Sequence, residues 1–208
     1  MFQVEQTNLG LWRVREIVDT PKYQGDGEYF RQWRLPKRFE NGLYRVETQS
    51  NDHNCSVYAV VTAGRLQGLE LSGERVTEEL GVTRDGVDPD QMYRGMTRLG
   101  IRSYLIENMS VPYLKDLLFG GKYCVIIDYQ EPECSIDEKI SGDAGHYAIA
   151  YAVDNRGFVL LGESSYEGSS RIHETELPAL WYDVSIRTGK WFFGTGIVVP
   201  ITYNRRSF

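Results

Sequence analysis

The stretch QSNDHNCSVYAVVTAGRLQG, residues 49–68, determines the interpretation of this chain. After its polar first part, apolar residues recur at helical spacing from Cys55 onward. The pattern predicts a helix that begins at Cys55 and ends near Gly68, because glycine commonly terminates helices. A thiol at a helix N-terminus lies in the positive field of the helix dipole, which favours the reactive thiolate. Cys55 is therefore a candidate nucleophile.

A second informative stretch, GHYAIAYAV at residues 145–153, alternates in the manner of a β-strand and carries His146 at its start. The turn DNRG and the apolar run FVLLGES follow, which predicts a hairpin whose second strand ends at Glu163. We expect the small-residue face of the strand, which carries His146, to pack against the helix of Cys55.

These residues supply the groups that amide cleavage by a thiol needs. Cys55 would be the nucleophile and His146 the base that takes and returns the proton. Glu163 would orient the imidazole, as the acid of a catalytic triad does. Gln49, together with the backbone N–H of Cys55, would donate hydrogen bonds to the developing oxyanion.

Helical patterns dominate the first half of the chain and strand patterns the second, which predicts an α+β fold with helices packed on an antiparallel sheet. Residues 1–44 read as an N-terminal extension of short strands and turns, and residues 45–208 as the catalytic domain. Helices are expected at 55–68, 73–82, 88–100 and 110–120.

The motif from Gln49 to Cys55, the run LKDLLFGGKYCVII, and HYAIAYAVDNRGFVLL followed by Glu163 together resemble the papain-like cysteine peptidases of the bacteriocin-processing group. The resemblance covers roughly residues 45–200. It implies a papain-like fold, a stand-alone peptidase, a peptide substrate and a preference for cleavage after small residues such as glycine. Two positions depart from the family pattern: Ser56 stands where glycine is usual, and Glu163 where aspartate or asparagine is usual.

The composition excludes several other classes of protein. The net charge of −6 over 208 residues argues against a nucleic-acid partner, which usually requires a basic patch. No signal peptide and no apolar run long enough to span a membrane is visible, so we expect a cytoplasmic protein with no membrane partner. No metal or cofactor motif is present, and the oligomeric state is open.

The three cysteines read as free thiols, with Cys124 buried in a strand; a bridge between Cys124 and Cys134 stays open. His53 precedes Cys55 too closely on a loop to serve it well as a base, and His173 is expected in a solvated loop. Asp154 is the alternative orienting acid, but a turn tip should point it away from the site.

Two other functions use the same residues. The triad could carry out amide transfer or deamidation instead of hydrolysis, because the chemical groups are identical. The chain could also be a catalytically degenerate papain-like domain that binds a peptide without cleaving it, for which Ser56 and Glu163 are the signals.

Overall fold

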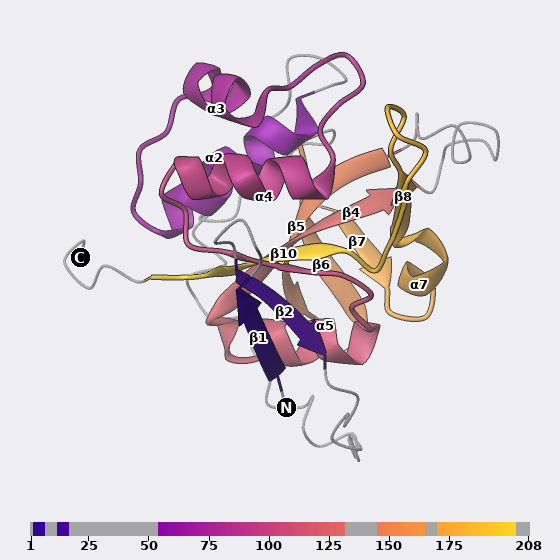
Figure 1. The fold of residues 1–208 in the computed structure, drawn as a ribbon. Coiled ribbons are helices and arrows are strands. Elements are labelled where there is room, and N and C mark those ends of the chain that lie inside the picture. Colours follow the sequence, from indigo (N-terminus) through magenta and orange to yellow (C-terminus); the bar gives the residue numbers. More distant parts are fainter. Residues whose placement is uncertain (1, 7–11, 17–53, 132–144, 165–169, 203–208) are drawn as a thin grey trace.

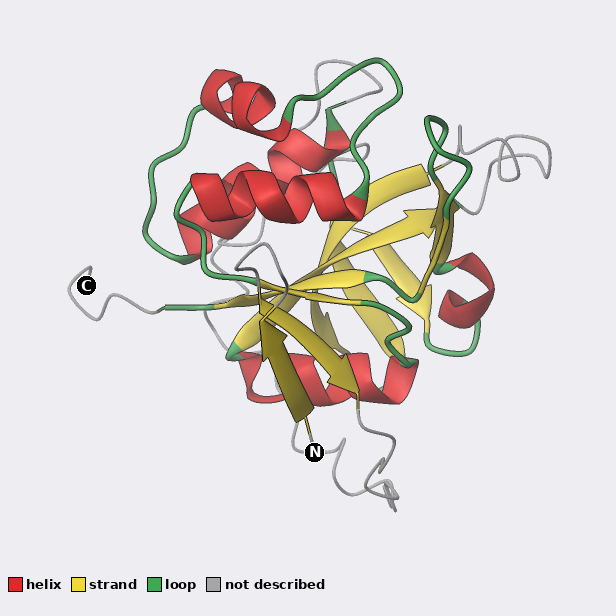
Figure 2. Ribbon diagram, viewed as in Figure 1, coloured by secondary structure: helices red, strands yellow, loops and turns green. Residues whose placement is uncertain are grey.

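The computed structural model describes residues 2–6, 12–16, 54–131, 145–164 and 170–202. Helices lie on both sides of one large sheet (Figures 1 and 2). The helices are α2 (Cys55–Leu66), α3 (Gly73–Leu80), α4 (Pro89–Arg98), α5 (Val111–Leu118), the 3-10 turn η1 (Phe119–Gly121) and α7 (Leu177–Leu180). The strands are β1 (Phe2–Gln6), β2 (Trp12–Glu16), β3 (Tyr104–Ile106), β4 (Tyr123–Gln130), β5 (Gly145–Val153), β6 (Phe158–Gly162), β7 (Ser170–His173), β8 (Tyr182–Val184), β9 (Trp191–Phe193) and β10 (Gly196–Pro200).

The main sheet has the order β1-β2-β3-β10-β4-β5-β6-β7. Its pairs are antiparallel except β2 with β3, which run parallel. The expected α+β class with a mainly antiparallel sheet is confirmed. The apolar run WFFGTGIVVP, residues 191–200, is interrupted at Gly194, which has a positive φ of 52°. Before it, β9 pairs with β8 in a small second sheet, and after it β10 enters the centre of the main sheet.

Local end signals explain where the helices begin and end. Ser72 caps α3 by accepting a hydrogen bond from the amide of Arg75, and Gly81 ends that helix with a φ of 63°. Ser110 caps α5 in the same way. Asp88 occupies the N-cap of α4 but makes no side-chain cap bond, because its carboxylate binds Arg187 instead.

Two apolar cores lie on opposite faces of the sheet. Helices α2, α3 and α4 pack on the face that carries Ile126 and Ile149, and α5 and α7 pack on the face that carries Ile127 and Ala148. The small-residue face of β5 therefore meets α5, and the prediction that it packs on the helix of Cys55 is wrong. Alternation identifies the two faces of a strand but does not tell which helix covers each one.

Strands β1 and β2 fall within residues 1–44, where the sequence predicts short strands, and they extend the sheet beyond β3. The domain boundary near residue 44 stays a prediction.

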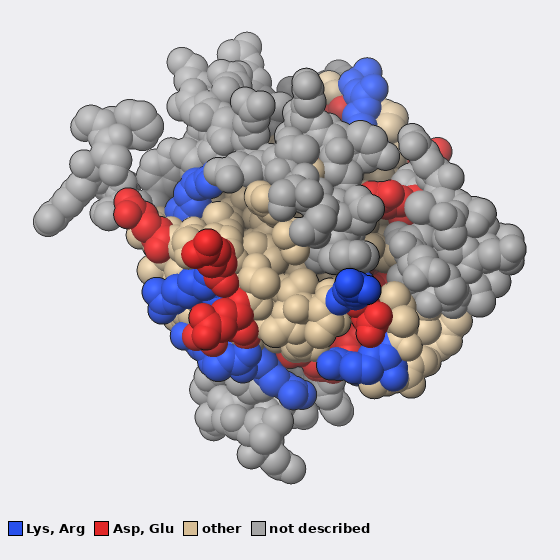
Figure 3. Space-filling view, turned by 90° about the horizontal axis from the view of Figure 1, so that it is seen from above, with Lys and Arg blue, Asp and Glu red and all other residues tan. Residues whose placement is uncertain are grey.

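No helix among the described residues is long and apolar enough to cross a membrane. On the face of the molecule in Figure 3, Lys and Arg side chains alternate with Asp and Glu side chains.

Candidate active site

The Cys55 side chain begins α2 at the edge of a cavity. No acidic residue lies in the first turn, and the N-cap residue, Asn54, makes no side-chain cap bond. The amides of Val57 and Tyr58 donate to the backbone carbonyl of Asn54, and the positive end of the helix dipole lies at Cys55. Cys55 is 8% exposed and lines this cavity. Cys55 is a free cysteine, as is Cys124, which is fully buried in β4; Cys134 lies outside the described residues.

The β5–β6 hairpin brings His146 and Glu163 together. Nε2 of His146 lies 2.7 Å from Oε2 of Glu163, and the two side chains are 4% and 0% exposed. This contact is the one that the sequence predicts for a hairpin following His146. Because Nε2 is bound to the acid, Nδ1 is the nitrogen left for a thiol.

Two hydroxyl groups hold Glu163 from its other side. Tyr129 and Ser170 donate hydrogen bonds to Oε1, at 2.6 Å and 2.9 Å. Both residues were missed by the sequence analysis. Tyr129 is the cross-strand partner of His146 in the β4–β5 pair, and Ser170 begins β7, so strand register would have been needed to find them.

Cys55 and Glu163 both influence the pKa of the His146 imidazole. Burial by itself would lower the pKa of His146, but hydrogen bonds to Cys55 and Glu163, and the negative charge of each, raise that pKa well above its ordinary value. The two neighbours therefore favour the charged form of the imidazole.

The other acids near the imidazole are less well placed. Oε1 of Glu131 lies 3.5 Å from Nδ1 of His146, and its side chain is 25% exposed. Asp154 accepts hydrogen bonds from the amides of Arg156 and Phe158 in its own turn, which lower its pKa after the opposing effect of burial. It is a structural turn residue, as its position at the turn tip suggests.

Three of the sequence predictions fall elsewhere. Gln49 and His53 lie outside the described residues. His173 ends β7, where its ring contacts Thr175 and the carbonyl of Arg156, so the expectation of a solvated loop is wrong. The apolar alternation of that strand is too short to be recognised in the sequence.

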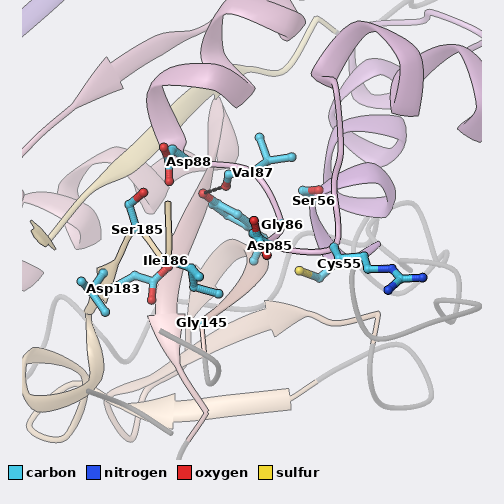
Figure 4. Close-up of a pocket in the computed structure, with 13 residues that line it drawn as sticks. Cys55, Ser56, Asp85, Gly86, Val87, Asp88, Gly145, Asp183, Ser185 and Ile186 are labelled. Carbon is cyan, nitrogen blue, oxygen red and sulfur yellow. Dashed lines mark hydrogen bonds between the residues drawn. The ribbon is translucent and has the colours of Figure 1, made fainter. Parts of the chain in front are cut away.

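A cavity of about 150 Å³ opens beside the nucleophile (Figure 4). Cys55 and Ser56 lie on one side of it, and Asp183, Ser185 and Ile186 lie on the other. Tyr147 also lines it and donates a hydrogen bond of 2.7 Å to the carbonyl of Val87. Its remaining lining residues are Arg84, Asp85, Gly86, Val87, Asp88, Gly145 and Val184.

The fold is shared with known peptidase domains. No protein-family profile and no curated protein matches the sequence. The structure is similar to the peptidase domain of Streptococcus ComA, a bifunctional ABC transporter involved in quorum sensing, with a TM-score of 0.54 and 14% identity over 76% of this chain and 98% of that domain. It is also similar to a Bacillus anthracis protein described as a C39-like peptidase, with a TM-score of 0.57 and 11% identity over 75% and 94%.

A third similar structure is a double-glycine-motif protease of an AMS/PCAT transporter in complex with a leader peptide. Its TM-score is 0.51 at 15% identity, over 74% of this chain and 90% of that chain. At such identities the likeness establishes the fold: the chain has the papain-like fold of the bacteriocin-processing peptidase domains.

Proposed function

We propose that the protein is a cysteine peptidase that hydrolyses peptide or isopeptide bonds. The observation that carries the proposal is the His146 imidazole, whose Nε2 lies 2.7 Å from Oε2 of Glu163 and whose pKa is raised by both Glu163 and Cys55. A nucleophile, a base and an orienting acid in this relation are the signature of covalent acyl transfer.

In the proposed reaction the Cys55 sulfur attacks the carbonyl carbon of the scissile bond, and the carbonyl oxygen becomes an oxyanion. The N-terminal amides of α2, starting with that of Cys55, and the side chain of Gln49 stabilise this charge. The protonated His146 gives its proton to the leaving amine as the C–N bond breaks and a thioester forms. His146 then takes a proton from water, which attacks the thioester and releases the acid product and the thiolate.

The glutamate departs from the family pattern without weakening this role. A longer side chain has more rotamers to lose, and here the hydroxyls of Tyr129 and Ser170 fix it from behind. Both carboxylate oxygens are thus used, one for the hydroxyls and one for the imidazole. This arrangement supports an active enzyme over a degenerate peptide-binding domain.

The direct test is turnover of a fluorescence-quenched peptide library, with products identified by mass. The neighbour with a bound leader peptide makes peptides with a Gly-Gly site the first members of such a library. We expect Cys55→Ala to abolish turnover while the circular dichroism spectrum stays unchanged. Cys124→Ala is the matched control, because it removes a buried thiol remote from the reaction and should leave turnover in place.

The product mass separates hydrolysis from related chemistry. Added water indicates a peptidase, an added amine indicates a transferase, and loss of ammonia indicates a deamidase. Retention of the parent rate by Cys55→Ala would mean that the nucleophile is assigned wrongly.

A further inference from the structure

Buried polar atoms without a hydrogen-bond partner lie at the wall of the cavity beside Cys55 and behind it. Among the described residues, both carboxylate oxygens of Asp128, Oε1 of Gln130 and Oγ of Ser56 are buried without any hydrogen-bond partner. Ser56 lines the cavity directly. Asp128 lies behind its wall, since Tyr147 is its cross-strand partner in β5 and Asp183 and Cys55 are its electrostatic neighbours. Unsatisfied buried acceptors cost about 1–3 kcal/mol each, so their concentration at one place calls for an explanation.

The carboxyl groups of Asp128 and Asp183 interact directly, and, after the larger effect of burial, a hydrogen bond between them raises the pKa of Asp128 and lowers the pKa of Asp183. The phenol of Tyr147 lies near Asp128 but directs its single proton to the carbonyl of Val87. The amide of Gln130 donates to Oδ1 of Asp183 at 2.7 Å and to the carbonyl of Tyr182 at 3.1 Å, which leaves its own oxygen unpaired. Oε1 of Gln130 can only accept a hydrogen bond, whereas the hydroxyl of Ser56 can accept or donate one.

The charges of the cavity are balanced at its rim but not in its depth. Arg84 and Asp85 are both exposed and carry opposite charges, and Asp88 forms an ion pair of 2.8 Å with Arg187. Deeper inside, no lysine or arginine of the described part of the chain is paired with Asp183 or Asp128.

The raised pKa values of the Asp128 and Asp183 carboxyl groups are consistent with the lack of a neighbouring cation among the described residues. Burial raises the pKa of Asp183 to about 6 against the opposing hydrogen bonds from the Val184 amide and Gln130. Burial, and then the charge of Asp183, raise the pKa of Asp128 well above its ordinary value. A cation placed between them would lower both values again.

The close approach of β8 to β5 depends on one glycine. A Cβ atom at Gly145 would lie 2.6 Å from both carboxylate oxygens of Asp183, so only glycine lets this acid reach the cavity next to His146. Strand β5, which carries the candidate base His146, thus also leaves room for Asp183 beside the cavity.

We propose that this cavity binds the basic side chain, lysine or arginine, of a peptide substrate next to the bond that Cys55 attacks. An ammonium or guanidinium group only donates hydrogen bonds and is positively charged, which is the complement of the Asp183 carboxylate and of the unpartnered Oγ of Ser56, both of which line the cavity. The inference rests on the proposed peptidase function and names the substrate class of that site. It adds a charged residue to the small residues that the fold alone suggests.

The test compares short glycine–alanine peptides that carry a single lysine at each position in turn with the same peptides carrying norleucine, which has the length of lysine without its charge. At pH 7.5 we expect one lysine position to raise kcat/KM at least about tenfold over norleucine, because a desolvated charge pair is broken in the norleucine peptide. Asp183→Asn should remove that preference. Asp116→Asn, an exposed acid on α5 across the sheet, is the matched control and should keep it.

Binding separates this inference from the proposed function. Fluorescence anisotropy with labelled peptides and the Cys55→Ala variant reports lysine preference even if no peptide is cleaved. If Asp183→Asn does not fold, Asp128→Asn takes its place. Cleavage or binding that is equal for lysine and norleucine at every position, or a preference that survives both substitutions, overturns the inference and leaves the peptidase proposal standing.

Discussion

Glu163 is one of the two residues that depart from the pattern implied by the sequence resemblance, and its hydrogen-bond geometry is well defined. Its two oxygens serve different partners, Nε2 of His146 on one side and the hydroxyls of Tyr129 and Ser170 on the other. Three donors around one buried carboxylate hold it in a single orientation. The two hydroxyls therefore fix the carboxylate, and the carboxylate in turn fixes the orientation of the imidazole.

Glu163→Gln tests this account at nearly constant shape. The neutral amide no longer stabilises the imidazolium, so the pKa of His146 should fall. We expect kcat to fall at least about tenfold with little change in KM, since each unit of pKa corresponds to about 1.4 kcal/mol between the two protonation states. Steady-state kinetics and the pH profile of kcat measure this.

Glu131→Gln is the matched comparison, because it removes the more exposed acid at 3.5 Å from the other nitrogen of the ring. The loss of kcat in Glu131→Gln should be much smaller than in Glu163→Gln. Equal losses in both variants would contradict the assignment of Glu163 as the orienting acid.

Asp128→Asn should stabilise the protein at high pH. The unfolded chain loses the Asp128 proton above about pH 4, whereas the folded chain keeps it to higher pH because burial raises the pKa. The unfolded state thus binds fewer protons, and the contribution of this group to stability falls as the pH rises between the two values. Asparagine does not ionise, so it makes no such pH-dependent contribution to stability.

Thermal unfolding at pH 8 and pH 4 tests whether the substitution stabilises the protein at high pH. At pH 8 we expect the variant to be more stable by about 1–3 kcal/mol, the cost of an unsatisfied buried group. At pH 4 the difference should vanish. Glu70→Gln, an exposed acid, should change neither midpoint, and a variant that is less stable than the parent at pH 8 would contradict the prediction.

At the scale of elements, α4 approaches α3 at Gly95. A Cβ atom there would lie 2.5 Å from Cδ2 of Leu80 and 2.9 Å from the carbonyl of Glu79. Gly95→Ala should therefore destabilise the fold by about 1–3 kcal/mol through overpacking, despite the better helix propensity of alanine.

The control lies at the start of α3, where a Cβ atom on Gly73 would meet only Val57 at 3.8 Å. Gly73→Ala should be neutral or slightly stabilising in urea unfolding. A Gly95→Ala variant as stable as Gly73→Ala would show that the two helices do not pack as described.

The elements also show what a sequence alone can and cannot predict. Caps and stops such as Ser110 and Gly81 are local signals, so the helices and their ends were predicted well. The faces of β5 were assigned to the wrong helix, because alternation carries no information on tertiary partners. The pairing of His146 with Glu163 could be predicted from one hairpin, whereas the approach of Asp183 to Asp128 joins β8 to β4 and depends on long-range packing.

At the scale of the whole molecule, β1 and β2 cover the β3 edge of the main sheet. If residues 45–208 form the catalytic domain, a chain lacking residues 1–44 should fold and retain Gln49 and the site. Its exposed sheet edge should promote self-association, because an uncovered edge strand offers unpaired backbone groups. Size-exclusion chromatography and circular dichroism measure this, and an unfolded fragment would place residues 1–44 within the fold.

The central claim is that Cys55 and His146 act as one reactive pair, and the rate of iodoacetamide labelling against pH tests it most directly. Mass spectrometry locates the label, and the fully buried Cys124 serves as an internal unreactive thiol. The account predicts that Cys55 is labelled rapidly at pH 6 in the parent protein and slowly in His146→Asn. Labelling that rises only near pH 8.5, about the pKa of an isolated thiol, and equally in both proteins would contradict it.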